Sequence, residues 1–126
     1  MSTRATYTFK DNNAKYHVYK HHDGYPLGAM EAIRNALSLA WDMPRFEADE
    51  FSAAFVAGNK LHGGGIRLLN QPHDYADIEF HYEISMKDER LFIEAFRVSW
   101  NSEKKDLDYN IIFSGTFDDF ISFSKK

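Results

Sequence analysis

The segment after the first predicted hairpin holds residues that could do chemistry, because His21 and His22 precede Asp23 there. Two imidazoles beside a carboxylate can transfer protons or bind a metal ion. On an extended strand, however, neighbouring side chains point to opposite sides, so the three groups converge only if the chain turns. A tight Asp-Gly turn that leads Tyr25 and Pro26 into a helix explains the same residues without chemistry. We favour this structural interpretation, with ligand binding as the next.

A second candidate is the segment 59–67, which contains three consecutive glycines at 63–65. Consecutive glycines can direct backbone N–H groups at an anion, and Lys60, His62 and Arg67 would add positive charge. The glycine spacing matches neither a Walker loop nor a dinucleotide-binding fingerprint. A flexible connection between a helix and a strand is the simpler explanation, although the chemistry suits a phosphate-bearing ligand.

Aromatic residues gather in the same part of the chain, where Tyr7, Tyr16, Tyr19 and Tyr25 occur near Arg4. Rings beside cations can stack on a nucleobase or on a side chain of a partner protein. The ligand-binding residues that we predict from the three segments together are Arg4, Tyr19, His21, His22, Asp23, Tyr25, Lys60, His62 and Arg67.

A third pattern is the strict alternation in residues 76–86. Apolar Ile78, Phe80, Tyr82, Ile84 and Met86 alternate with Asp77, Glu79, His81, Glu83 and Ser85. Carboxylates two residues apart on a strand can perform acid–base chemistry. The solvated face of a half-buried strand gives the same pattern, and this is the interpretation that we expect to hold.

The elements that must position these residues follow from hydrophobic periodicity. A hairpin is predicted over 3–21, helices over about 28–41 and 45–58, and strands at 66–69, 76–86, 91–100 and 109–113. A capping box at 116–119 predicts a short C-terminal helix. Sequential strands with short connections favour antiparallel pairing. We therefore predict a single α+β domain over 1–126, with a mostly antiparallel sheet of five to six strands.

Composition excludes several classes of function. The 126 residues include 15 Lys and Arg against 19 Asp and Glu, a net charge of −4, which does not suit generic DNA binding. The absence of Cys excludes disulfides, zinc–thiolate sites and cysteine nucleophiles. No apolar stretch approaches the ~20 residues of a membrane span, and no cofactor motif is present. We expect a cytoplasmic protein without a cofactor or a membrane partner.

Two segments of the chain resemble a family of small phage and prophage proteins. These are Ser-Thr-Arg-Ala-Thr-Tyr-Thr-Phe at 2–9 and Tyr-Lys-His-His-Asp-Gly-Tyr-Pro-Leu-Gly at 19–28. Members begin with a Thr-Arg-Ala strand and carry a Tyr-x-His-x-Asp-Gly-Tyr-Pro loop; segments 53–59 and 76–82 extend the similarity over residues 2–85. The family has no assigned biochemistry, so the resemblance implies a viral origin, in an infected or lysogenic bacterial host, and no catalytic residues. Small accessory phage proteins are often host-takeover or counter-defence factors, which is an analogy.

These observations favour a non-enzymatic binding module that captures a host protein or a small nucleotide-like ligand. One alternative is a small hydrolase or transferase that uses His21, His22 and Asp23. Another is a structural protein that assembles into a homo-oligomer through an exposed sheet edge or an apolar patch.

Overall fold

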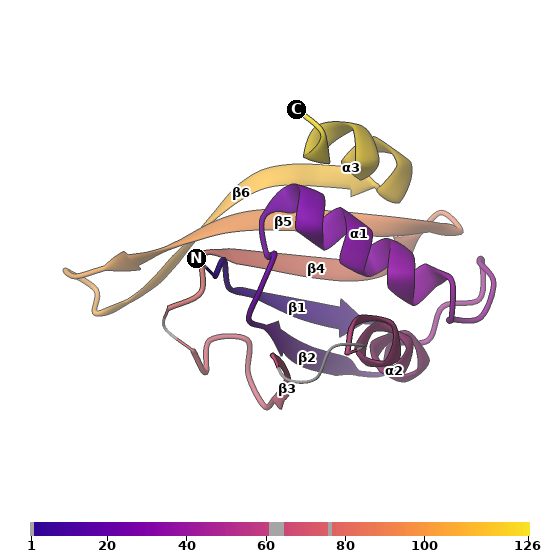
Figure 1. Cartoon of the computed structure of the whole chain (residues 1–126), viewed down its shortest axis with the longest axis horizontal. Helices are drawn as coiled ribbons and strands as arrows, with labels where there is room; N and C mark the ends of the chain where they lie inside the picture. Colours follow the sequence, from indigo (N-terminus) through magenta and orange to yellow (C-terminus); the bar gives the residue numbers. More distant parts are fainter. Residues whose placement is uncertain (1, 61–64, 76) are drawn as a thin grey trace.

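The computed structural model describes residues 2–60, 65–75 and 77–126, and it shows an α+β fold (Figure 1). The elements in chain order are β1 (Ala5–Lys10), β2 (Lys15–Lys20), α1 (Pro26–Leu37), α2 (Ala48–Asn59), β3 (Ile66–Leu69), β4 (Phe80–Lys87), β5 (Arg90–Asn101), β6 (Asp106–Thr116) and α3 (Phe117–Ser124). The predicted fold class, with two helices after the hairpin and a short C-terminal helix, is confirmed.

The strands form one mixed sheet in the order β3-β2-β1-β4-β5-β6. Four of the five neighbouring pairs are antiparallel, as predicted, but β1 and β4 pair in parallel at the centre of the sheet. In that register Thr6 lies opposite His81 and Thr8 lies opposite Glu83. This central pair brings together two segments that are about 75 residues apart in the chain, and it creates the site described below.

The main core lies between one face of the sheet and the three helices. Alternate residues of β1 point into it, and Ala5, Tyr7 and Phe9 are completely buried. The rings of Tyr7 and Phe55 have centroids 4.6 Å apart, and Phe9 packs against Phe51 at 5.7 Å. The period of two in the strand is therefore the direct result of burial on this face.

The helix boundaries differ from the predicted ones for local reasons. Helix α1 begins at Pro26, because a residue without an N–H suits the first turn of a helix. It ends at Leu37, so the predicted extension to Trp41 is wrong; that ring is 43% exposed and stacks on the guanidinium of Arg45 at 3.3 Å. Helix α2 begins at Ala48, whose N–H donates to Asp11 Oδ2 of the first hairpin over 2.8 Å.

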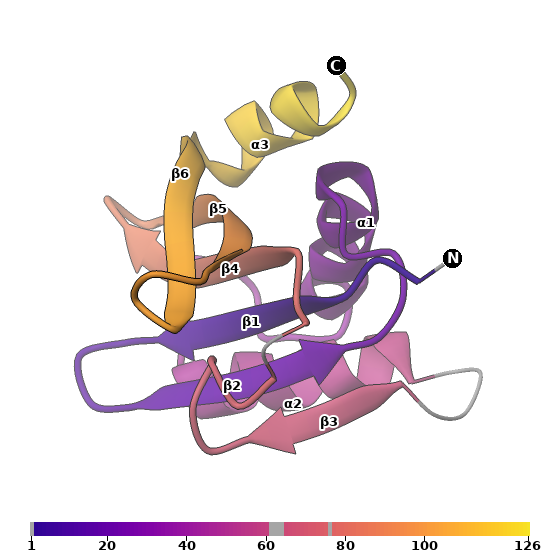
Figure 2. The same ribbon diagram turned by 90° about the vertical axis from the view of Figure 1, so that its left-hand side faces the viewer.

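The opposite face of the sheet is solvated only in part, because the side chains of Asp77 and Glu79 are 57% and 43% exposed whereas His81 is buried. His81 is only 3% exposed, because its ring packs against Phe96 at 5.7 Å and against Tyr109 at 5.5 Å. The chain between β3 and β4 runs in front of β2 on this side (Figure 2) and stacks Tyr75 on Tyr19 with centroids 4.3 Å apart. A second, smaller core thus covers part of this face. In the described residues no helix is long and apolar enough to cross a membrane.

Candidate functional site

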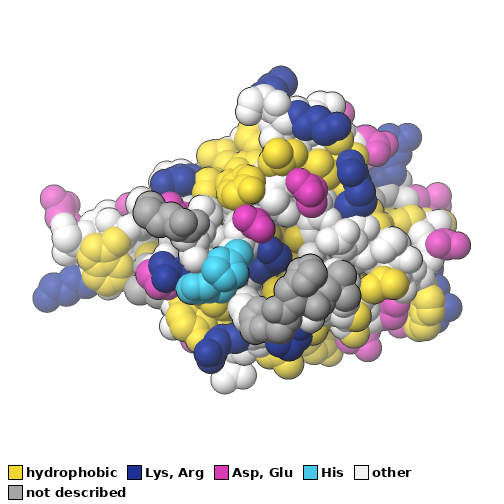
Figure 3. Space-filling model, in the orientation of Figure 1, with side chains coloured by type: hydrophobic (Ala, Val, Ile, Leu, Met, Phe, Trp, Pro, Cys, Tyr) yellow, Lys and Arg dark blue, Asp and Glu magenta, His cyan; other side chains and the backbone are white. Residues whose placement is uncertain are grey.

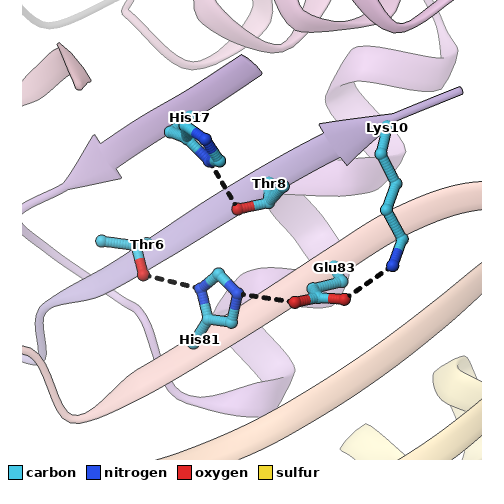
Figure 4. A network of polar contacts seen from close by, with 6 residues as sticks. All are labelled: Thr6, Thr8, Lys10, His17, His81 and Glu83. Carbon is cyan, nitrogen blue, oxygen red and sulfur yellow. Dashed lines mark hydrogen bonds and ion pairs between the residues drawn. The ribbon is translucent and has the colours of Figure 1, made fainter. Parts of the chain in front are cut away.

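Polar side chains of β1, β2 and β4 meet on the sheet face opposite the helices, which we call the polar face (Figure 4). Thr6 Oγ1 and His81 Nδ1 lie 2.8 Å apart, and His81 Nε2 lies 3.3 Å from Glu83 Oε2. On the other side of the carboxylate, Lys10 Nζ donates to Glu83 Oε1 over 2.9 Å. A neutral imidazole that donates to the carboxylate through Nε2 must accept the hydroxyl proton of Thr6 at Nδ1. The network therefore fixes the position of the carboxylate from both sides.

Glu83 is ionised throughout the physiological range of pH. The hydrogen bond from His81 is the largest cause that lowers its pKa, and Lys10 adds to it, so that the pKa falls to about 2 although burial opposes the shift. The side chain is 28% exposed, so a bound molecule can reach it. The site thus presents a fixed acceptor of hydrogen bonds.

A second pair on the same face joins β1 to β2. Thr8 Oγ1 lies 2.8 Å from His17 Nδ1, where the two residues are register partners. Burial lowers the pKa of His17, and the nearby His81 and Lys15 lower it further. The imidazole of His17 is therefore neutral near pH 7 and is oriented by the hydroxyl of Thr8.

Two adjoining hollows open beside these networks. The first, of about 250 Å³, is named the cationic hollow and is lined by Thr8, Lys10, Lys15, His17, Gln71, Pro72, His73 and Glu83. The second, of about 260 Å³, is named the aromatic hollow and is lined by Pro72, His73, His81, Glu83, Phe96 and Tyr109. Pro72, His73 and Glu83 line both hollows. The positive groups that line the cationic hollow thus lie next to the aromatic rings that line the other, with the three shared residues between them.

Five of the predicted binding residues meet at one end of the polar face. Tyr19 Oη lies 2.8 Å from His21 Nδ1, and Arg4 Nε donates to the same atom over 3.3 Å. Burial lowers the pKa of His21, as do Arg4, His22 and Arg67. Arg67 is the register partner of Tyr19. Figure 3 shows histidine side chains gathered in one patch, with basic and acidic side chains at its border.

None of these five residues lines either of the two hollows. Tyr19 is only 4% exposed and stacks on Tyr75, so its ring serves the second core. The ring of His22 meets that of His21 edge to face at 4.6 Å, and its Nδ1 lies 3.0 Å from Ser2 Oγ.

Asp23 and Tyr25 lie on the helix side of the sheet instead. They line a separate hollow of about 320 Å³ whose other residues are Lys20, Gly28, Glu31, Ala32, Asn35, Gly58 and Asn59. Within the described residues, no hydrogen bond or ion pair joins Asp23 to His21 or His22. The bend that we predicted is present, since Asp23 has a φ of 58° and Tyr82 Oη donates to the carbonyl of Gly24 over 2.6 Å. The turn therefore places the two imidazoles and the carboxylate apart.

The glycine-rich candidate is only partly described. Lys60 follows α2 as its C-cap, and its N–H donates to the carbonyl of Val56 over 3.0 Å. His62, Gly63 and Gly64 lie outside the described residues. Gly65 adjoins the first candidate, because His21 N donates to its carbonyl over 2.8 Å. The two predicted segments are thus neighbours in space.

None of the predicted binding residues that the structure describes lines either hollow: Lys10, Lys15 and His17 were not among them, and Glu83 was expected only on a solvated strand face. One local pattern could have indicated them. In β1, Thr6 and Thr8 alternate with buried aromatic residues, which indicates that the strand has a polar face opposite its apolar one. Their partners, however, come from β4, and nothing local in the sequence indicates that pairing. In the part of the chain that the structure describes, no group of three or more His, Cys, Asp or Glu side chains is placed to hold a metal ion.

Comparison of the chain with protein-family models, curated proteins and solved structures found no match. The case for a function therefore depends on the geometry of the polar face.

Proposed function

We propose that this protein is a binding module that captures a small nucleotide-like ligand on its polar face. The observation that carries the proposal is the junction of the cationic hollow and the aromatic hollow, which share Pro72, His73 and Glu83. A nucleotide joins an anionic group to a flat ring, and the two hollows offer a surface for each of them beside the residues that they share.

The cationic hollow suits the phosphate. Lys15 supplies a charged ammonium at its rim, and His17 and His73 supply ring nitrogens. Lysine binds phosphate as a compact charge with three donors, and a histidine nitrogen that carries a proton donates as well. The negative charge of Glu83 is offset by Lys10, so it does not leave the hollow anionic.

The aromatic hollow suits the ring. The rings of Phe96 and Tyr109 meet nearly at right angles, at 80°, and Tyr109 is 37% exposed. A flat ring that enters this hollow can pack against the exposed part of Tyr109. Stacking of a base on an aromatic side chain contributes about 1–3 kcal/mol.

The resemblance to small phage proteins supports a cellular setting for this proposal. An accessory factor that sequesters a host nucleotide would act by stoichiometric capture in the bacterial cytoplasm. Counter-defence is one role that such capture serves, and it rests on the analogy alone.

Binding is better supported than homo-oligomeric assembly. Strand β6 forms one edge of the sheet and exposes Ile111 and Ile112, which could pair with a second copy. Its register shifts where Ala95 pairs with Phe113 and Phe96 with Ile111, which leaves Ile112 as a bulge. Bulges interrupt the regular edge that strand addition requires.

The test is isothermal titration of the purified protein with GMP, AMP and UMP, combined with amide chemical shifts. We expect shifts on the polar face, and Tyr109→Ala should weaken binding by about 5-fold to 100-fold, as the loss of one stacking contact implies. Tyr16→Ala is the matched control, since Tyr16 is 43% exposed and lines neither hollow. If no nucleotide binds at millimolar concentration, or if both variants behave alike, the proposal is wrong.

A further inference from the structure

We infer that the ligand of the polar face is a ribonucleotide, and that the carboxylate of Glu83 recognises it through the hydroxyl groups of its ribose. This inference rests on the proposed function. In a nucleotide the sugar links the flat ring to the phosphate. A nucleotide bound across both hollows therefore places its sugar beside the residues that the hollows share, which are Pro72, His73 and Glu83.

The chemistry of Glu83 decides which edge of the sugar it meets. An ionised carboxylate accepts hydrogen bonds and donates none. One edge of a ribose carries the 2′- and 3′-hydroxyl groups, which can donate, whereas the ring oxygen at the opposite edge can only accept. The carboxylate therefore selects the edge with the hydroxyl groups, since the ring oxygen would set two acceptors against each other. In dinucleotide-binding folds an Asp or Glu binds the ribose 2′-hydroxyl group in this way.

Both oxygens of the carboxylate keep capacity for the sugar. Oε1 accepts a hydrogen bond from Lys10 over 2.9 Å, and Oε2 lies 3.3 Å from His81 Nε2. Each carboxylate oxygen has a second lone pair. The side chain of Glu83 is 28% exposed, so a ligand can reach it. The two hydroxyl groups stand on adjacent carbons, so one carboxylate can accept from both without losing its existing contacts.

The carboxylate is held in position before any ligand arrives. His81, which faces Oε2, is 3% exposed, and its Nδ1 lies 2.8 Å from Thr6 Oγ1. Lys10 holds the other oxygen from the opposite side. A fixed acceptor discriminates between ligands more strongly than a mobile one, because a deoxyribose leaves part of its hydrogen-bonding capacity unused where the ligand excludes water.

The experiment is isothermal titration of GMP, AMP and UMP into the wild type, each beside its 2′-deoxy and its 2′-fluoro-2′-deoxy counterpart. We expect a ribonucleotide to bind at least about fivefold more tightly than its 2′-deoxy counterpart, because a hydrogen bond to a charged acceptor is lost. The 2′-fluoro counterpart should bind no better than the 2′-deoxy one, since fluorine fills the place of the hydroxyl group but cannot donate.

Glu83→Gln is the variant that ties this preference to the carboxylate. Its amide keeps one acceptor oxygen, which Lys10 engages, and puts a donor in place of the other. The preference for the ribonucleotide should therefore fall at least about threefold. Glu79→Gln is the matched control and should keep the wild-type preference, because Glu79 directly precedes β4, is 43% exposed and lines neither hollow.

The outcomes separate this inference from the proposed function. A wild-type preference for the ribonucleotide below about fivefold would overturn the inference and leave the proposed function standing. A 2′-fluoro nucleotide that binds as tightly as the ribonucleotide would do the same, and this comparison decides the matter if Glu83→Gln does not fold. A smaller fall in a Glu83→Gln variant with a native circular dichroism spectrum would also overturn the inference. Failure of every nucleotide to bind at millimolar concentration would overturn both.

Discussion

The carboxylate of Glu83 should make the stability of this protein depend on pH within a defined window. Hydrogen bonds from His81 and Lys10 lower its folded-state pKa from 4.5 to about 2. A group whose pKa is lower in the folded state stabilises the fold above its unfolded-state pKa. That contribution is complete above about pH 5 and is lost as the pH falls from there through about 2.

The magnitude follows from the same two values. At about 1.4 kcal/mol per pKa unit, the difference between 4.5 and about 2 corresponds to about 3 kcal/mol at neutral pH. Integration of the linkage relation shows that about 2 kcal/mol of this is lost between pH 7 and pH 3. The side chain is only 28% exposed, so solvent screens the interaction incompletely.

The assay is urea unfolding of the wild type, Glu83→Gln and Glu79→Gln at pH 7 and pH 3. The difference in unfolding free energy between the wild type and Glu83→Gln should shrink by about 2 kcal/mol at the lower pH. Glu79→Gln should follow the wild type within about 0.5 kcal/mol, because its contact with Arg97 is long, at 3.8 Å, and exposed. Parallel pH profiles of the wild type and Glu83→Gln would refute the reasoning, as would an NMR titration of Glu83 centred near 4.5.

Two further predictions concern the core and the turn. Tyr7 and Tyr82 are both completely buried, but Tyr7 Oη has no hydrogen-bond partner among the described residues, whereas Tyr82 Oη donates to the carbonyl of Gly24. Tyr7→Phe should therefore stabilise the fold by about 1 kcal/mol and Tyr82→Phe destabilise it by about 1 kcal/mol, in the same urea assay; equal signs would contradict this account. Gly28→Ala should destabilise by about 2 kcal/mol or more, because its Cβ would overlap the carbonyl of Asp23, and an unchanged melting temperature would show that the turn relaxes freely.

The type and the order of the elements follow from local sequence patterns, whereas several of their ends do not, since α1 ends at Leu37 instead of Trp41. The alternation in β1, the Asp-Gly turn before α1 and the cap of α3, where Asp119 N donates to Thr116 Oγ1 over 3.3 Å, are all as predicted. These features depend on residues within a few positions of one another. Backbone geometry, capping and burial periodicity act over that range, so a single chain contains the information locally.

The candidate site was decided only by the tertiary structure. The parallel pairing of β1 with β4 brought Thr6 to His81 and Lys10 to Glu83, and the pairing of β4 with β5 set His81 opposite Phe96. A polar position on a strand gives the same sequence pattern whether solvent or another part of the chain covers it. Which of the two occurs depends on contacts between distant segments, whose formation local propensity does not specify.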